Sequence, residues 1–303
     1  MFIVGEGSGV KPLLHMHGRK RFLLKLASRT LTLGERTVIM GVLNVTPDSF
    51  SDGGKFFTVK SAVQGALRMQ EAGADILDVG AESTRPGSAG ISAAEELARL
   101  LPVLQELRGR LKIPISLDTQ KSAVAELAIG AGVEMLNDIS GLRSDPRLAE
   151  VAARHKVPIV LMHRRGTPLT MQKGPFAKNV IQDVTRGLRG SLALARRAGV
   201  RHSQIILDPG IGFGKSHAQN YELLARLAEL AKLGYPLLVG TSRKGFLGAT
   251  LARDEKPLPA NERIWGSAAT VAASILNGAH MVRVHDVEEM RQVARAADAV
   301  LSA

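Results

Sequence analysis

The sequence predicts an α/β protein, a single-domain (β/α)8 TIM barrel, and three observations favour this fold. Short apolar segments alternate with longer helical ones, which is typical of parallel strands joined by crossover helices. The alternation repeats eight times from Ile39 onward, the number of units that closes a barrel. No linker interrupts the series. The alternative is a doubly wound open sheet, which usually has a Gly-rich turn after its first strand, whereas here that turn reads Asn-Val-Thr-Pro.

Each expected strand is a short apolar run bounded by charged or turn-forming residues, as buried parallel strands are. The expected strands lie at 38–43, 76–80, 114–118, 135–138, 158–163, 204–208, 237–240 and 281–285. The segments between them are rich in Ala, Leu and Arg at helical spacing, for example 61–72, 93–107, 122–131 and 221–233. A short strand and turn at 31–35 lead into the first barrel strand.

We expect residues 31–303 to form the barrel and residues 1–30 to be a basic N-terminal extension, either a disordered arm or a transit-like segment. The chain has 40 basic and 28 acidic residues, a formal net charge of +12. A nucleic-acid partner is not expected, because aromatic residues make up only 4% and base-stacking surfaces need them. The basic field is better suited to attracting anionic substrates.

The same composition narrows the setting of the protein. There are no cysteines, so disulfides, thiolate metal sites and thiol nucleophiles are excluded. No apolar run is long enough to span a membrane, and the start of the chain lacks the order of a secretory signal. We therefore expect no membrane partner and a cytoplasmic location.

Polar residues follow nearly every expected strand, and in a barrel all eight carboxyl ends meet at one mouth. Each such residue has a plainer explanation alone, as a helix cap, a turn or a surface charge. Together they predict a site. These residues are Asn44, Glu82 to Arg85, Asp118, Asn137 and Asp138, His163, Asp208, Ser242 to Lys244, Arg283 and His285.

The chemistry of this set points to two ligand groups. Asp118, Asn137 and Asp208 would suit a flat heterocycle with adjacent N–H donors, because carboxylates accept hydrogen bonds side by side. Cationic side chains follow the last two strands, where barrels usually bind phosphate. These are Lys244, Arg283 and His285. Asn44 beside them offers the hard oxygen that Mg²⁺ takes together with phosphate oxygens and water.

One tempting motif is declined. The run from Gly210 to Ser216 ends like a P-loop, but the first glycine of that motif would stand at position 209, which is Pro209. We interpret these glycines as a flexible approach to a ligand that lies under Phe213.

The chain resembles the dihydropteroate synthase family from about Leu33 to its C-terminus. The resemblance rests on eight motifs in order: NVTPDSFSDGG (44–54), DVGAESTRPG (78–87), SLDTQK (116–121), NDISG (137–141), LMH (161–163), LDPGIGFGK (207–215), GTSRK (240–244) and RVHDV (283–287). It implies a transferase of folate biosynthesis. Such an enzyme condenses 6-hydroxymethyl-7,8-dihydropterin diphosphate with p-aminobenzoate to give 7,8-dihydropteroate and diphosphate by an SN1-like route.

The resemblance also implies roles for individual residues. The pterin would be held by Asp118, Asn137, Met162, Asp208, Phe213 and Lys244. The diphosphate would be held by Asn44, Arg283 and His285, with Mg²⁺ as the cofactor on Asn44. The p-aminobenzoate site would be formed by Phe50, Thr84, Arg85, Pro86, Phe213 and Ser242. The catalytic set would be Asp118, Lys244, Arg283 and His285. Sulfonamides are implied inhibitors, and a homodimer is the implied assembly.

Two other functions stay open. A pterin-binding barrel of a methyltransferase type shares the carboxylate pocket but needs neither Arg283 and His285 nor the loop at 83–87. A catalytically silent binding paralogue should lack Lys244 or one of the loop motifs, and here all are present. Turnover with both substrates distinguishes the three.

Overall fold

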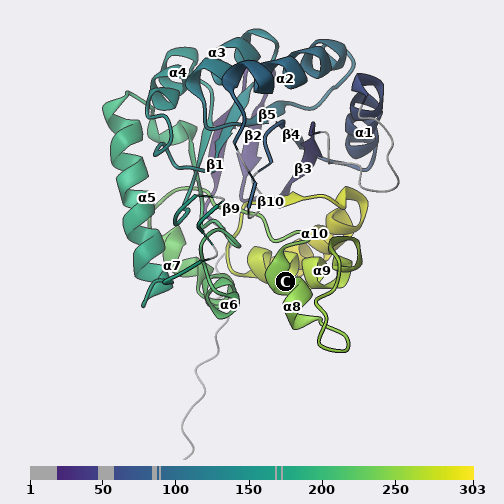
Figure 1. Cartoon of the computed structure of the whole chain (residues 1–303), viewed down its shortest axis with the longest axis vertical. Coiled ribbons are helices and arrows are strands. Elements are labelled where there is room, and N and C mark those ends of the chain that lie inside the picture. The colour runs from purple at the N-terminus through teal and green to yellow at the C-terminus, as the bar shows by residue number, and fades with distance from the viewer. Residues whose placement is uncertain (1–18, 47–57, 84–86, 89, 168, 172) are drawn as a thin grey trace, which may run out of the picture.

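The computed structural model describes residues 19–46, 58–83, 87–88, 90–167, 169–171 and 173–303. A sheet of eight parallel strands forms the centre of the molecule, with helices around it (Figure 1). The strands are β3 (Val38–Asn44), β4 (Ile76–Gly80), β5 (Ile115–Asp118), β6 (Met135–Asp138), β7 (Ile159–Met162), β8 (Ile205–Asp208), β9 (Leu238–Val239) and β10 (Met281–Val284).

The strand order makes this sheet a barrel. Along the sheet the order is β8-β7-β6-β5-β4-β3-β10-β9, and every neighbouring pair is parallel. A parallel bridge between Leu207 in β8 and Leu237, just before β9, brings the two edges of the sheet together. The expected (β/α)8 barrel is therefore confirmed.

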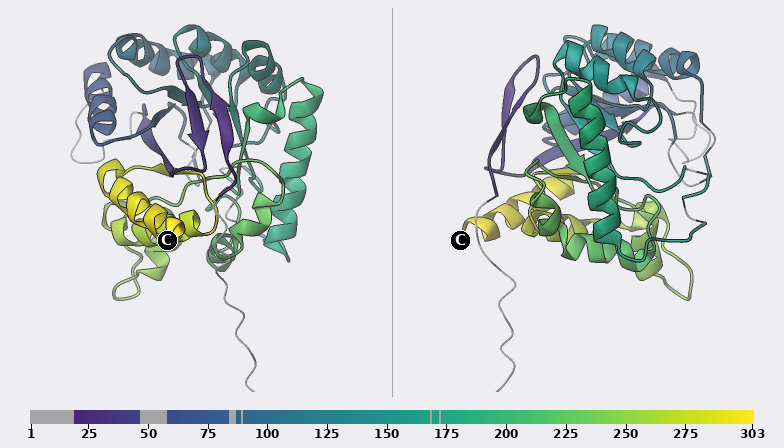
Figure 2. Two further views of the ribbon diagram at one scale, coloured as in Figure 1. Left: turned by 180° about the vertical axis from the view of Figure 1, so that it is seen from behind. Right: turned by 90° about the vertical axis from the view of Figure 1, so that its left-hand side faces the viewer.

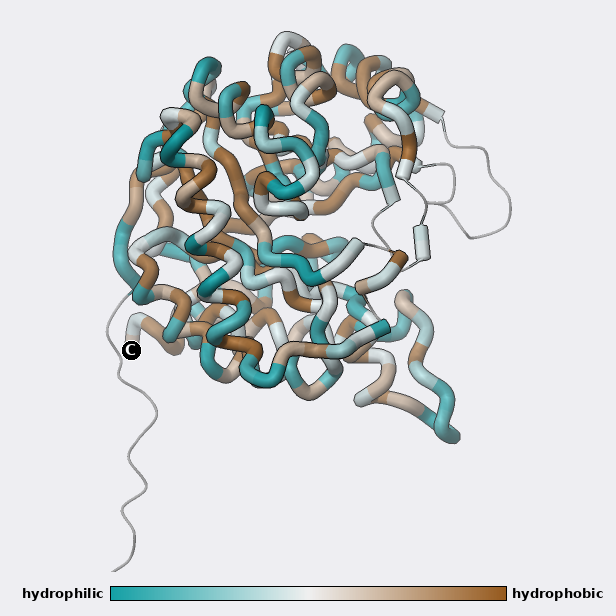
Figure 3. The backbone as a smooth tube through the Cα atoms, turned by 60° about the vertical axis from the view of Figure 1, so that its left-hand side comes forward, coloured by the Kyte–Doolittle hydropathy of each residue, from teal (hydrophilic) through white to brown (hydrophobic). Residues whose placement is uncertain are grey.

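Helices follow the strands and pack their apolar faces on the outside of the sheet. They are α1 (Val59–Glu71), α2 (Ala93–Leu107), α3 (Ser122–Gly130), α4 (Arg147–His155), α5 (Val180–Arg197), α6 (His217–Ala225), α7 (Leu227–Ala231), α8 (Gly245–Thr250), α9 (Ile264–Leu276) and α10 (Val287–Ser302). Two short 3₁₀ turns, η1 (His202–Gln204) and η2 (Ala260–Glu262), complete the described elements. Apolar and polar stretches alternate along the outer helices (Figure 3), as expected when one face covers a sheet.

The predicted strands are confirmed to within two residues, but one predicted helix is wrong. The segment expected as a single helix at 221–233 is divided between α6 and α7, which meet at Arg226. Helix α6 begins at His217, before the expected position 221. It begins there because Ser216 and Gln219 form a capping box. The break occurs where Arg226 leaves helical geometry and pairs with Glu222 and Glu229 on either side of it.

An antiparallel hairpin of β1 (Phe22–Lys25) and β2 (Thr30–Leu33) lies across one end of the barrel (Figure 2). The strand expected near 31–35 is confirmed as β2. Within the segment that we expected to be an N-terminal extension, Leu24 is buried in a cluster with Val38, Met135 and Met281 at the starts of barrel strands. Residues 1–18 lie outside the described residues.

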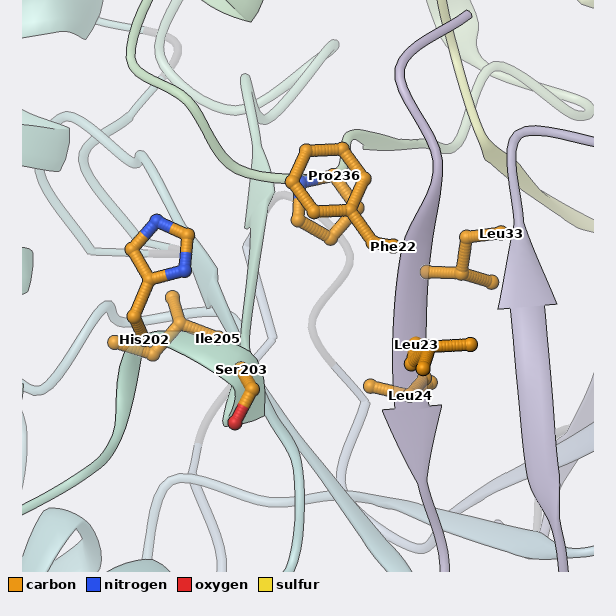
Figure 4. Close-up of a pocket in the computed structure, with 8 residues that line it drawn as sticks. All are labelled: Phe22, Leu23, Leu24, Leu33, His202, Ser203, Ile205 and Pro236. Atoms are coloured by element: carbon orange, nitrogen blue, oxygen red, sulfur yellow. The ribbon is translucent and has the colours of Figure 1, made fainter.

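The hairpin also leaves a small hollow at this end (Figure 4). Its lining residues are Phe22, Leu23, Leu24, Leu33, His202, Ser203, Ile205 and Pro236. These side chains come from the hairpin and from the turn before β8, and most are apolar. The hollow lies at the end of the barrel where the strands begin, away from the polar strand ends that predicted a site.

Inside the barrel, four of the strands change from apolar to polar over two residues. Successive inward side chains are two positions apart. Ile76 and Met281 belong to the buried apolar cluster under the hairpin, and Asp78 and Arg283 stand two positions further along the same strands. The same step separates Met135 from Asn137 and Ile206 from Asp208. The barrel interior therefore has an apolar floor with a polar layer above it.

Candidate active site

The polar layer is centred on a buried arginine between two carboxylates. Arg283 donates from Nε to Asp78 Oδ2 at 2.7 Å and from a terminal nitrogen to Asp118 Oδ2 at 2.9 Å. Asn137 Nδ2 donates to the same Asp78 oxygen at 2.9 Å. Three strands besides that of Arg283 therefore contribute to one hydrogen-bonded group. Asp78 is fully buried, and its other oxygen, Oδ1, has no hydrogen-bond partner among the described residues.

Gly80 explains how Asp118 reaches this position. The two residues are neighbours in the register of β4 and β5. A Cβ at Gly80 would lie 3.2 Å from the Asp118 Cβ, closer than side chains usually pack. The missing side chain leaves room for the carboxylate to turn inward toward Arg283.

Burial changes the protonation of these groups. It raises the pKa of Asp118 to about 7, against the opposing effect of the Arg283 charge. For Arg283, burial opposes the charge, but the carboxylates of Asp78 and Asp118 dominate and raise its pKa further. Arg283 therefore remains a cation, and Asp118 is poised to gain or lose a proton near neutral pH.

A second carboxylate lies at the end of β8. Asp208 is buried, and its Oδ1 accepts a hydrogen bond from the Gly210 backbone at 2.6 Å. Burial raises the pKa of Asp208 to about 6, while the Gly210 bond and the charge of Lys244 oppose that rise. In turn, burial and then Arg283 lower the pKa of Lys244 to about 8.

Lys244 is also in contact with an aromatic ring. Its Nζ lies 4.0 Å from the centre of the Phe213 ring, a cation–π distance. Gly212 makes this approach possible, since a Cβ there would lie 3.1 Å from the Lys244 side chain. One wall of the polar layer is thus formed by Lys244, Phe213 and Asp208. It is linked electrostatically to the group around Arg283, because the charge of Arg283 acts on Lys244.

His285 differs from what its sequence position suggested. Its backbone N–H donates to Ser242 Oγ at 3.2 Å, and its Nδ1 is 3.0 Å from the same oxygen. Burial, followed by the charges of Arg283 and Arg243, lowers the pKa of His285 to about 3. The ring is therefore neutral at pH 7, and its Nδ1 shares a hydrogen bond with Ser242 Oγ. The expected cation is neutral in this structure.

The remaining predicted residues are placed as follows. Met162 is buried at the end of β7, paired in register with Asp208. Asn44 is half-buried at the end of β3, beside Gly80. Ser242 is buried under His285. Four predicted residues of the p-aminobenzoate set lie outside the described residues: Phe50, Thr84, Arg85 and Pro86.

Asp78 is the site residue that the search of strand ends missed. It lies in the middle of β4 rather than at its end, although it opens one of the motifs that carried the family resemblance. The usable signal was a carboxylate within an otherwise apolar strand, since buried carboxylates are almost always paired. Its partner Arg283 was already among the predicted residues.

In the described part of the chain, no helix is long and apolar enough to cross a membrane. No group of three or more His, Cys, Asp or Glu side chains there is arranged to hold a metal ion.

Comparison with known proteins agrees with this geometry. Residues 40–285 match the family described as "Pterin binding enzyme". A dihydropteroate synthase of Synechocystis sp. is 50% identical over 267 residues, which cover 88% of this chain and 91% of the relative.

Solved structures are similar over nearly the whole chain. The Yersinia pestis dihydropteroate synthase in a sulfonamide drug complex has a TM-score of 0.87 and 41% identity, covering 93% of this chain and 100% of that one. The Xanthomonas albilineans dihydropteroate synthase in complex with 7,8-dihydropteroate has a TM-score of 0.82 and 39% identity, covering 93% and 99%.

Proposed function

This chain belongs to the pterin-binding enzyme family, among the dihydropteroate synthases, and we propose how its residues perform that reaction. The substrates are 6-hydroxymethyl-7,8-dihydropterin diphosphate and p-aminobenzoate, and the products are 7,8-dihydropteroate and diphosphate. The observation that carries the proposal is the buried layer in which Asp118, Asn137 and Asp208 face the cations Arg283 and Lys244. This layer offers acceptors for a pterin and positive charge for its diphosphate.

The pterin is held by the carboxylates and amide of the layer. Asp208 and Asp118 accept from adjacent N–H groups of the heterocycle, and Asn137 both donates and accepts. Met162 and Phe213 pack against its faces, and Lys244 donates to a ring acceptor. The short Gly210–Asp208 bond supports this role for Asp208, because it fixes the carboxylate through one oxygen and leaves the other available.

The diphosphate is held by Arg283 and His285, and Asn44 beside them would hold a Mg²⁺ ion. Asn44 is a suitable protein ligand, since Mg²⁺ usually takes few protein oxygens and completes its shell with phosphate and water. When bound, the ion neutralises charge on the leaving group.

The reaction then proceeds by an SN1-like route. The C–O bond to diphosphate breaks, and its electron pair leaves with the diphosphate. The p-aminobenzoate nitrogen supplies its lone pair to the resulting pterin carbocation, a C–N bond forms, and the nitrogen releases one proton to solvent. Asp118 stabilises the positive charge on the pterin. Because Asp118 has a pKa near 7, it is anionic in a large fraction of molecules at neutral pH.

For p-aminobenzoate we propose a site that includes Phe213 and Ser242, together with Phe50, Thr84, Arg85 and Pro86, which lie outside the described residues. Ser242 also contacts His285 of the diphosphate site through two hydrogen bonds. Sulfonamides are expected to occupy the p-aminobenzoate site, so their inhibition should be competitive with p-aminobenzoate. Non-competitive kinetics, or no inhibition, would count against the assignment.

The deciding experiment is turnover. The purified chain is incubated with the pterin diphosphate, Mg²⁺ and p-aminobenzoate, and dihydropteroate and diphosphate are both quantified. Equal amounts of the two products are expected. A folded protein that binds the pterin but forms no dihydropteroate would be a binding paralogue, and one that transfers a methyl group instead would be of the methyltransferase type.

The homodimer is a further part of the proposal. Helix α9 carries an apolar stripe on its outer side, in which Trp265 is 80% exposed and Leu276 is 36% exposed. Ala269 and Ala272 lie between them at helical spacing. A stripe of this kind on an outer helix favours a partner surface. The cytoplasmic location expected from the sequence stays a prediction.

A further inference from the structure

The loop after β8 contains a buried lysine that the proposed mechanism does not use. Lys215 is only 2% exposed, although lysine is among the residues least often buried. It ends the glycine-rich run 210–215 and directly precedes Ser216, the N-cap of α6. A charged group in such a place is stable only if its hydrogen bonds are satisfied.

Every donor of Lys215 has an acceptor. Its Nζ is 3.0 Å from His163 Nδ1, 3.0 Å from the His163 carbonyl oxygen and 3.1 Å from the Phe213 carbonyl oxygen. A lysine ammonium has three donors and no acceptor. The ammonium therefore joins the end of β7 to the loop that carries Phe213.

His163 is matched to this arrangement. Its Nδ1 pairs with Lys215 Nζ, and its Nε2 lies 3.6 Å from Asp183 Oδ2. Burial and then the Lys215 charge lower the pKa of His163, in agreement with a neutral ring. The link thus continues from the loop through His163 toward α5.

The loop packs against the end of β7 without room for a side chain at Gly210. This glycine has a φ of +68°, and a Cβ there would lie 1.9 Å from the His163 carbonyl oxygen and 3.1 Å from Lys215 Nζ. Glycine itself restricts the backbone least, so contacts made by other residues must hold the loop in this shape. Lys215 supplies the missing constraint from within the loop.

Two residues of the pterin pocket depend on the shape of this loop. Phe213, whose carbonyl Lys215 holds, places its ring against Lys244 at 4.0 Å. Gly210, which packs against Lys215, donates to Asp208 at 2.6 Å. Lys215 itself has no place in the pocket wall, because its donors are used on the other side of the loop.

We propose that Lys215 is a positioning residue that locks the loop 209–215 into the shape that receives the pterin, acting through Phe213 and Asp208. The proposal rests on the proposed function, because it takes the pterin as the ligand of this pocket. Its distinguishing consequence is selectivity: loss of Lys215 should damage pterin binding and leave anion binding on the β10 side intact.

The test uses Lys215→Met, which keeps the length of the side chain and removes its charge and donors. Calorimetry measures binding of 6-hydroxymethylpterin, which has no phosphates, and of pyrophosphate with Mg²⁺. Pterin affinity should fall by about tenfold or more, while pyrophosphate affinity changes by less than about twofold. The control Lys232→Met removes an exposed lysine and should change neither. If Lys215→Met does not fold, the same measurements are made on Lys215→Gln.

A double-mutant cycle distinguishes positioning from general loss of packing. If Lys215 acts through Phe213, then Lys215→Met should weaken pterin binding much less in a Phe213→Ala background than in the wild type. Additive effects would overturn the proposal, as would wild-type pterin affinity in a folded Lys215→Met variant or an equal loss of pyrophosphate binding. Failure of the wild type itself to bind pterin would instead refute the proposed function.

Discussion

Arg283 is shared between Asp78 and Asp118, so its role in the ligand-free protein is wider than holding an anion. The charge of Arg283 opposes the rise that burial produces in the pKa of Asp118. When diphosphate binds, it competes with these carboxylates for the same guanidinium. The sequence suggested that Arg283 binds the diphosphate. The structure adds that Arg283 also contacts Asp118 of the pterin pocket.

Replacing Arg283 by alanine should therefore affect both ligands, in different ways. Pyrophosphate loses charge-assisted hydrogen bonds worth about 1.5–3 kcal/mol, a weakening of about 10- to 150-fold. Pterin affinity should also fall, and more at pH 6 than at pH 8.5, because removing the cation raises the pKa of Asp118 further. Calorimetry with pyrophosphate and with 6-hydroxymethylpterin at both pH values measures this. Unchanged pyrophosphate affinity in a folded variant would remove Arg283 from the diphosphate site.

Asp208 predicts opposite effects of pH on binding and on stability. Its folded-state pKa is raised to about 6 by burial, so the folded protein binds this proton more tightly than the unfolded chain does. As pH falls from about 7 to about 4, protonation of Asp208 should stabilise the fold and, by removing an acceptor, weaken pterin binding. The matched variant is Asp208→Asn, which cannot titrate.

The free energy of unfolding is measured as a function of pH for the wild type and for Asp208→Asn. The pterin affinity of the wild type is measured over the same pH range. The wild type should gain stability relative to Asp208→Asn between pH 7 and pH 4. A difference that stays constant across this range would mean that Asp208 does not titrate there. Pterin affinity that does not fall on acidification would place the acceptor elsewhere.

At the scale of elements, the β1–β2 hairpin is where reasoning from sequence was incomplete. The first 30 residues are basic and match none of the motifs, which favoured a separate arm. The hairpin is nonetheless specified by a few apolar side chains, with Leu24 and Leu33 alternating toward the barrel floor. Arg19 is also fixed, by hydrogen bonds to Thr37 and the Ala279 carbonyl. Such short strands give too weak a pattern to be distinguished from a basic tail.

Deletions on either side of this boundary should differ. Removing residues 1–18 should leave stability and turnover unchanged. Removing residues 1–28 takes away β1 and exposes the barrel floor, and loss of the buried Leu24 side chain alone costs about 1.5–3 kcal/mol. Chemical denaturation of the two truncated proteins gives the comparison. Equal stability of both would show that the hairpin contributes no net packing energy.

For the whole molecule, the barrel was predictable because a short apolar segment followed by a helical segment recurs eight times along the chain. The sites were predictable to the extent that they lie at strand ends, as Asp118, Asn137 and Asp208 do. Asp78 lies one layer deeper, and the neutral state of His285 depends on burial that no local pattern encodes. Contacts between distant strands, such as Arg283 with Asp78, decide these features.

The assembly gives the last prediction, because the α9 stripe is the feature of the surface that the folded monomer does not explain. Trp265 is 80% exposed, which is unusual for so large an apolar side chain. If two copies bury their α9 stripes against each other, Trp265→Glu places a charge in a desolvated interface, and dimers should dissociate.

Sedimentation velocity of the wild type should give the mass of two chains, and of Trp265→Glu the mass of one, with unchanged circular dichroism. The matched control is Leu127→Glu, since Leu127 is 54% exposed on α3 and should stay outside the interface. A dimeric Trp265→Glu protein would exclude the α9 stripe as the contact. A monomeric wild type at high concentration would exclude the homodimer itself.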